Sequence, residues 1–369
     1  VATGLNATVV FSRSPTTLTC RDRVMMGGFF EQMTNFEWIG ISFAECHKGG
    51  LLIHNSSHVI VSDASFTRIG DVSLDAINLP SESSTNPSIW PNDESILRTN
   101  INVAAALTMT GSTDVELYDL VFDRCETRQS TAGAMLTNIE NLLMERVTFS
   151  NNYAALGAGG LHMSGVHTAQ INDCTFDANQ ATVGAGAHII YSSQIEVRRV
   201  SATANHAYSS GGAFSVDGSV VYFYEGTISN NAVAHGPGGG VHIISSIVEL
   251  RDITMVDNLS EQLPSSDQLA DPRLTDSQFQ QIFGSAITVI SPSFTKHSQW
   301  KPIDNRFECI NGTVYFEGAP LGDNKCFVDQ IDSASSLPGD IDLDGKADLP
   351  DRSLLVLRSS TISLRANRA

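Results

Sequence analysis

The sequence has few basic residues, no long apolar run and no closely spaced pair of cysteines. Lysine and arginine number 22 against 40 aspartates and glutamates, which gives a formal net charge of −18. That charge would repel the phosphates of nucleic acids and of anionic lipids, so the sequence predicts neither as a partner. An apolar stretch of about 18 residues, long enough to cross a bilayer, is also missing, and we expect no membrane span.

The cysteines are scattered, and none forms the Cys-x-x-Cys pair that is typical of zinc sites. They are Cys20, Cys46, Cys125, Cys174, Cys309 and Cys326. Cys20 and Cys46 are separated by about one turn of the repeat described below, which brings a disulfide between adjacent turns within reach. Cys309 and Cys326 could close a short loop. The other two lie about two turns apart, too far for a bridge, and Cys174 is expected to be a small buried apolar side chain.

Four sequons for N-linked glycosylation occur, at Asn6, Asn55, Asn258 and Asn311. Together with the acidic composition they predict a secreted, glycosylated eukaryotic protein. Asn258 also occupies a position of the repeat at which we expect an inward-facing amide. If its side chain points inward, it cannot carry a glycan.

The main feature that the sequence does contain is a phrase that recurs every 26 or 27 residues. An apolar pair and a short polar stretch ending in Asn are followed by a pair of small residues, usually glycines. The phrase occurs around Phe149 and Asn152, and returns around Phe176 and Asn179. A fixed period of this size predicts a solenoid, in which each turn packs on the next.

Positions within the repeat indicate which side chains face the core. In the turn of Phe149, Leu142 and Met144 alternate as in a strand, and the three-residue step to Val147 breaks the alternation at a corner. After the glycine pair the alternation resumes, so Leu161 should also point inward. Three short strands per turn, stacked in register, predict an all-β fold, a right-handed parallel β-helix.

Asparagine occupies the position three residues after the phenylalanine in five consecutive turns. These residues are Asn152, Asn179, Asn205, Asn231 and Asn258. They predict a ladder of side-chain amides, each hydrogen-bonded to the turns above and below, because Asn suits tight turns and carries both donors and an acceptor.

Three histidines share another position of the repeat, two residues after the glycine: His162, His188 and His242. Alternation predicts that they face outward, and the spacing of the turns puts His162 and His188 about 5 Å apart. Adjacent imidazoles could share a metal ion. A stack of surface histidines without a metal is the simpler interpretation.

The F-x-x-N and G-G-A phrases resemble the repeats of chlamydial polymorphic outer-membrane proteins and of related right-handed β-helix proteins. The resemblance covers about residues 20–258. The motifs that carry it are Phe149-x-x-Asn152, Phe176-x-x-Asn179 and Gly211-Gly212-Ala213. It implies the β-helix fold and a role as a surface adhesin.

These patterns divide the chain into three parts. We expect a parallel β-helix over residues 1–289, with polar loop insertions at about 70–99 and 259–282, a C-terminal cap over 290–331 and a calcium-binding segment over 332–369. The cap would cover the open end of the solenoid, where an exposed strand edge invites aggregation.

Residues 340–351 have the ligand spacing of a calcium loop. Asp340, Asp342 and Asp344 occupy positions 1, 3 and 5, Gly345 the sharp turn, Lys346 the backbone-carbonyl position, and Asp348 and Asp351 positions 9 and 12. A hard cation needs several oxygen ligands, so the predicted cofactor is Ca²⁺. The segment resembles one half of a dockerin, a domain that carries two such halves, and it also resembles the loop of an EF-hand.

The sequence favours a non-enzymatic role. β-Helix enzymes that cleave acidic polysaccharides need clustered carboxylates, or calcium with a basic residue, on one face. The outward charges are scattered instead: Glu145, Asp173, Arg198, Arg199, Glu225 and Asp252. We therefore predict an extracellular structural or adhesive protein that self-associates, for example as the subunit of a fibre, or that binds surface proteins or glycans. The alternative is a carbohydrate-binding or polysaccharide-cleaving β-helix module.

Overall fold

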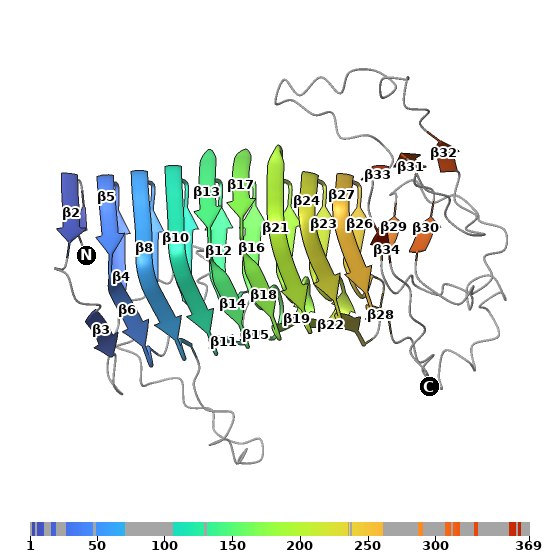
Figure 1. Cartoon of the computed structure of the whole chain (residues 1–369). Coiled ribbons are helices and arrows are strands. Elements are labelled where there is room, and N and C mark those ends of the chain that lie inside the picture. Colours follow the sequence, from blue (N-terminus) through green and yellow to red (C-terminus); the bar gives the residue numbers. More distant parts are fainter. Residues whose placement is uncertain are drawn as a thin grey trace, which may run out of the picture.

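A computed structural model shows the chain as a right-handed parallel β-helix, which confirms the predicted fold class (Figure 1). It describes residues 16–19, 27–46, 49–70, 106–128, 131–234, 236 and 238–260, and otherwise only the short strands whose bounds are given below. No helix in this described part of the chain is long and apolar enough to cross a membrane.

The strands form three parallel sheets, which we call A, B and C. Sheet A contributes one strand per turn: β1 (Ala2–Thr3), β4 (Gly28–Glu31), β7 (Leu51–His54), β9 (Leu107–Thr110), β12 (Ala134–Thr137), β16 (Leu161–Ser164), β20 (Ala187–Ile190), β23 (Phe214–Asp217), β26 (Val241–Ile244), β29 (Ile287–Ile290) and β30 (Phe307–Ile310).

Sheet B is the largest, and its strands bend in the middle or divide into two. They are β2 (Asn6–Val10), β3 (Thr16–Thr19), β5 (Thr34–Ile39), β6 (Ile41–Ala44), β8 (Ser57–Thr67), β10 (Thr113–Asp123), β13 (Asn141–Glu145), β14 (Thr148–Ser150), β17 (Thr168–Asn172), β18 (Thr175–Asp177), β21 (Ile195–Thr203), β24 (Val220–Ser229), β27 (Ile247–Val256), β31 (Thr313–Glu317), β32 (Val328–Gln330), β33 (Leu354–Arg358) and β34 (Thr361–Ile362).

Sheet C is narrow and follows the asparagine position of each turn. Its strands are β11 (Glu126–Thr127), β15 (Tyr153–Ala154), β19 (Gln180–Val183), β22 (His206–Ser210), β25 (Ala232–Val233) and β28 (Leu259–Ser260).

The bend in sheet B coincides with the break in alternation that the sequence shows. Asp119, Arg146, Asp173 and Arg199 occupy this corner on successive turns, and their φ angles are 52°, 54°, 53° and 51°. A non-glycine residue in this left-handed region costs about 1 kcal/mol. The stacked strands on either side hold the corner in that conformation, because each turn is in register with its neighbours.

The apolar positions of the repeat form one continuous core, as the sequence predicts. Its centre is a stack of phenylalanines, each at most 1% exposed: Phe43, Phe66, Phe122, Phe149 and Phe176. Their ring centroids lie 5.8, 4.9, 4.9 and 5.1 Å apart. These values are close to the spacing of about 4.8 Å between adjacent strands, so each turn contributes one ring to the stack.

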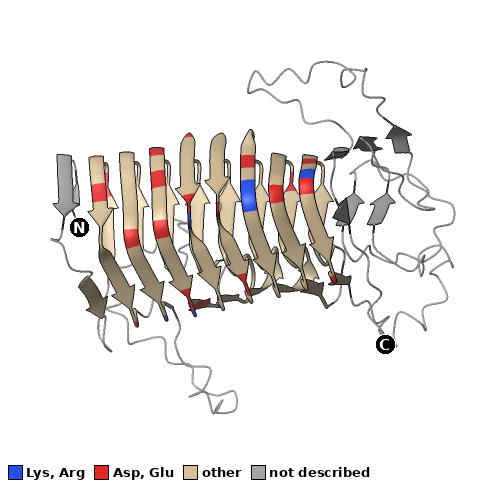
Figure 2. Ribbon diagram, viewed as in Figure 1, with Lys and Arg blue, Asp and Glu red and all other residues tan. Residues whose placement is uncertain are grey.

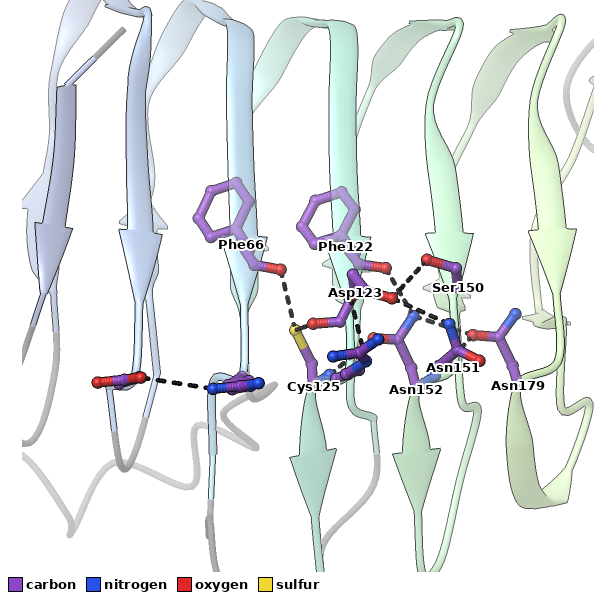
Figure 3. Close-up of polar contacts among 11 residues, drawn as sticks. Phe66, Phe122, Asp123, Cys125, Ser150, Asn151, Asn152 and Asn179 are labelled. Atoms are coloured by element: carbon purple, nitrogen blue, oxygen red, sulfur yellow. Dashed lines mark hydrogen bonds and ion pairs between the residues drawn. The ribbon is translucent and has the colours of Figure 1, made fainter.

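The predicted asparagine ladder is present along the corner between sheets B and C (Figure 3). Nδ2 of Asn152 donates to Oδ1 of Asn179 at 2.9 Å, and Nδ2 of Asn179 donates to Oδ1 of Asn205 at 2.9 Å. Each amide also donates to a core carbonyl of the preceding turn, as Asn179 does to the oxygen of Phe149 at 3.0 Å. The ladder therefore satisfies buried backbone groups that would otherwise lack partners.

A second ladder, built from serine, lines the corner between sheets A and B, and we did not predict it. The Oγ atoms of Ser192, Ser219 and Ser246 accept hydrogen bonds from the backbone N–H groups one turn earlier, at 3.1, 3.0 and 3.0 Å. Ser56 and Ser112 do the same nearer the N-terminus. Serine fits here because its short side chain reaches the neighbouring turn without filling the core.

Two turns are longer than the others. Leu51 pairs with Leu107 and Val241 pairs with Ile287, whereas Leu107 pairs with Ala134 only 27 residues later. Residues 71–105 and 261–286 fall within these two turns and are outside the described residues, as are most residues of the predicted insertions.

Strands from the C-terminal part of the chain pair with the two main sheets. In sheet A, β29 pairs with β26 and β30 pairs with β29; in sheet B, β33 pairs with β27 and β31 pairs with β33. The segments that the sequence assigns to the cap and to the calcium-binding region thus both contribute strands.

Candidate functional site

Sheet B carries a cluster of aromatic and charged side chains on its outward face. Since Val221 and Phe223 point into the core, the intervening and following residues of β24, Tyr222 and Tyr224, point outward. The register then places residues of β21 and β27 beside them. We call this set of six residues the tyrosine platform: Glu196, Arg198, Tyr222, Tyr224, Glu249 and Arg251. Figure 2 shows the acidic and basic side chains together on β21 and β27.

The two tyrosines form the centre of the platform. Their ring centroids are 6.3 Å apart and the ring planes differ by 6°, so the two rings are nearly parallel. Both side chains are half-buried, and this burial raises the pKa of both phenols. At neutral pH they are therefore uncharged, with faces partly open to solvent.

Two arginines from the adjacent turns enclose Tyr224. The Cζ atom of Arg198 lies 4.6 Å from the ring centroid and that of Arg251 lies 5.3 Å from it. Both distances are within the range of cation–π attraction. One residue from β21 and one from β27 thus hold the ring of β24 in place.

Each arginine is itself fixed by a glutamate two residues earlier on its own strand. Nη2 of Arg198 lies 2.8 Å from a carboxylate oxygen of Glu196, and Nη2 of Arg251 lies 2.9 Å from one of Glu249. The Glu249 side chain is only 9% exposed. These ion pairs favour the ionised form of each carboxylate, so neither glutamate is arranged as a general acid.

Such a surface has the chemistry for recognising a polyhydroxylated ligand. Aromatic faces bind apolar C–H groups, whereas guanidinium and carboxylate groups exchange hydrogen bonds with hydroxyls. The geometry on sheet B therefore fits binding, and it lacks the free acid that glycoside cleavage needs.

The sequence analysis identified only part of this cluster. Arg198 was among the outward charges, but Tyr222, Tyr224 and Arg251 were missed. The signal was present: alternation around the inward Val221 and Phe223 assigns both tyrosines to the outer face. What the sequence pattern left out was the pairing between turns that joins them to the arginines.

The other outward charges that we named belong to the corners of the coil. Arg199 forms a two-point ion pair with Asp173, at 2.7 and 2.8 Å, and lowers the pKa of that carboxyl. Arg146 does the same with Asp119, at 2.7 and 2.9 Å. These pairs are exposed and link adjacent turns, so we assign them no ligand.

The sequons differ in their surroundings. Asn55 is exposed at a corner, with a φ of 47°. Asn258 is 7% exposed; its Oδ1 accepts from Asn231 and its Nδ2 donates to the carbonyl of Ile228. A glycan at Asn258 would require removing this amide from the ladder, so the predicted glycosylation there is incompatible with the fold. Asn6 has no described side chain, and Asn311 lies outside the described residues.

The cysteines divide into bonded and free ones. Cys46 is in a disulfide, whereas Cys125 and Cys174 are free and buried, in agreement with the spacing argument. Burial raises the pKa of both free thiols to about 12, so they are unreactive at neutral pH. Cys20 and Cys326 are outside the described residues and the Cys309 side chain is not described, so both pairings stay predictions.

The predicted calcium ligands also lie outside the described residues. This applies to Asp340, Asp342, Asp344, Lys346, Asp348 and Asp351. Calcium binding by this loop stays a prediction from the sequence.

The predicted histidine row lies on the outward side of sheet A, but it is more buried than a surface stack. His242 is 4% exposed, and neither of its ring nitrogens has a hydrogen-bond partner among the described residues. Burial lowers the pKa of His242 to about 4. The folded protein therefore holds this imidazole in its neutral form.

The state of His242 predicts a loss of stability in acid. Its pKa is about 4 when folded, against about 6.5 in an unfolded chain. Below pH 6.5 the unfolded state binds a proton that the folded state excludes, so the stability present at neutral pH falls as the pH drops towards 4. Between pH 7 and 4.5 the unfolding free energy of the wild type should fall by about 2 kcal/mol more than that of His242→Gln.

Urea denaturation at both pH values measures this difference. Substitution of the exposed His206 by Gln is the control, and it should leave the pH dependence unchanged. Equal pH dependence in wild type and His242→Gln would contradict the buried, neutral state of His242.

A comparison with known families agrees with the architecture. Residues 92–225 match the family model for a right handed beta helix region. No curated protein and no solved structure matches the chain. The match covers the central turns, including most of the tyrosine platform, and it supports the fold class.

Proposed function

We propose that this protein is an extracellular adhesive β-helix that binds carbohydrate through the tyrosine platform. The observation that carries the proposal is the enclosure of Tyr224 by Arg198 and Arg251, beside the nearly parallel ring of Tyr222. Six side chains from three consecutive turns converge there on one outward face. A rigid scaffold that presents fixed aromatic and charged groups pays little entropy on binding.

Two further features support an extracellular location. A disulfide at Cys46 is typical of a protein that folds in an oxidising compartment. The sequon at Asn55 is on the surface, where an attached glycan has room. Self-association into a fibre, which the sequence also predicts, stays a hypothesis.

The alternative is a polysaccharide-cleaving enzyme. The family that residues 92–225 match includes both polysaccharide-cleaving and adhesin-like proteins. We favour binding because both platform carboxylates are paired with arginine. An assay for newly formed reducing ends, run on each glycan that binds, separates the two activities.

Glycan binding should depend on Tyr224. We expect the wild type to bind a subset of glycans on an array, and Tyr224→Ala to bind the same glycans at least tenfold more weakly in calorimetric titration. The reason is loss of the ring surface and of two cation–π contacts, each contributing about 1 kcal/mol. Tyr224→Phe should keep most of the affinity, because it retains the ring.

The control is Tyr153→Ala, which removes an exposed tyrosine from sheet C and should leave the affinity unchanged. Absence of glycan binding by the wild type, or equal binding by Tyr224→Ala, would reject the proposal.

A further inference from the structure

Two of the histidines on the outward side of sheet A lie against each other. His162 on β16 pairs in register with His188 on β20. Their ring centroids are 5.2 Å apart and the ring planes are at 65°. Metal–nitrogen bonds are about 2 Å long, so two nitrogens that share one ion are within about 4 Å of each other. The observed separation of the rings permits this arrangement.

The pair is largely shielded from solvent, and its hydrogen bonding is incomplete. The Nδ1 atom of His162 is buried and has no hydrogen-bond partner among the described residues. Most buried polar atoms in proteins have a partner, and an unpaired one needs a physical explanation. A bound cation would supply it, because a neutral imidazole nitrogen without a proton is an electron-pair donor.

The electrostatic surroundings restrict the kind of ion. Burial lowers the pKa of His162 to about 4, and burial together with His162 and His242 lowers the pKa of His188 to about 3. No carboxylate contributes to either value, so the pair is neutral and has no negative charge close to it. Burial of a divalent ion among neutral ligands costs far more than burial of a monovalent one, since the solvation penalty grows with the square of the charge.

The number and type of ligands also favour a soft monovalent ion. The described residues contain no group of three or more His, Cys, Asp or Glu side chains arranged to hold a metal, so the site offers two imidazoles. Met135 occupies the adjacent position of the row on β12, in register with His162, and is 7% exposed. Imidazole and thioether are both ligands for copper, and thioether selects the reduced ion.

We propose that His162 and His188 form a binding site for Cu⁺, with Met135 as a neighbouring soft ligand. The site is separate from the tyrosine platform, because it lies on sheet A and the platform lies on sheet B. It holds the ion between two consecutive turns of the coil.

The test is a titration of the protein with Cu⁺ under ascorbate, in competition with a chromogenic Cu⁺ chelator. We expect one high-affinity ion per chain and an affinity at least 100-fold lower in His162→Gln and in His188→Gln. His206→Gln, which removes an exposed histidine on sheet C, should bind as the wild type does. Circular dichroism of each copper-free variant verifies that it is folded.

X-ray absorption of the wild-type copper complex keeps the test valid even if a variant misfolds. Nitrogen scatterers of imidazole, with or without one sulfur, would support the site. A shell made only of sulfur would assign the ion to cysteine and overturn the proposal. The proposal also fails if His188→Gln binds Cu⁺ as tightly as the wild type, or if Zn²⁺ displaces Cu⁺ at equal concentration.

Discussion

Replacement of Asn205 by Ala should lower the free energy of unfolding by about 4 kcal/mol. Nδ2 of Asn205 donates to the carbonyl of Phe176 and to Oδ1 of Asn231, both at 2.9 Å. Its Oδ1 accepts from the backbone N–H and from Nδ2 of Asn179, at 3.1 and 2.9 Å. The substitution leaves these buried partners without hydrogen bonds, and each unsatisfied group costs about 1 to 3 kcal/mol.

Urea denaturation followed by circular dichroism measures the change. The matched control is Asn141→Ala, which removes an exposed amide with a single hydrogen bond to Asp114. That control should change the unfolding free energy by less than about 0.5 kcal/mol. Similar effects of the two substitutions would show that the ladder contributes no more than an ordinary surface amide.

Replacement of Gly160 by Ala should destabilise the protein by about 3 kcal/mol, because the added methyl group has no room. A Cβ atom at this position would lie 2.4 Å from the carbonyl oxygen of Gly186 on the next turn and 3.2 Å from the ring of Phe176. That oxygen cannot move away easily, since it accepts a hydrogen bond from the N–H of Leu161 at 3.0 Å. Overpacking of this kind typically costs 1 to 3 kcal/mol.

The control for Gly160→Ala is Gly40→Asn. Gly40 has a φ of 72°, and no atom lies within 4 Å of its Cβ position. Asn tolerates this left-handed conformation, so the control should cost less than about 1 kcal/mol. Thermal unfolding of both variants compares them directly, and an equal loss of stability would mean that steric contact between turns does not limit this position.

Much of the fold could be predicted because two independent periods agree in the sequence. The 26- or 27-residue period aligns Phe122, Phe149 and Phe176, and the alternation of two within each turn assigns their neighbours to the core or to the surface. Asparagine at one position in five turns was a further signal, since an amide is unusual in an apolar core unless it forms a ladder. Each of these signals is local to one turn and is then repeated.

The serine ladder and the tyrosine platform escaped prediction for different reasons. Serine is common in turns, so Ser192 or Ser219 alone gives no reason to expect a buried hydroxyl. The platform depends on neighbours that are far apart in the chain: Tyr224 is 26 residues from Arg198 and 27 from Arg251. A sequence pattern lists their positions, but only the register brings a guanidinium over the ring.

The burial of the histidine row shows the same limit. Alternation correctly places His162 and His188 on the outward side of sheet A, in adjacent strands. It predicts exposure there, whereas the structure shows shielded rings with lowered pKa values. Direction depends on the backbone of one strand, but burial depends on everything packed around it.

The amino-acid pattern alone was thus sufficient for the coil, its core and its asparagine ladder, because hydrophobic periodicity and turn chemistry act over a few residues and recur in every turn. The tertiary structure was needed for the enclosure of Tyr224, for the loss of the Asn258 sequon and for the pairing of His162 with His188. Each of these depends on atoms from different turns meeting at a distance of a few ångströms, and the stacking of the turns determines that distance.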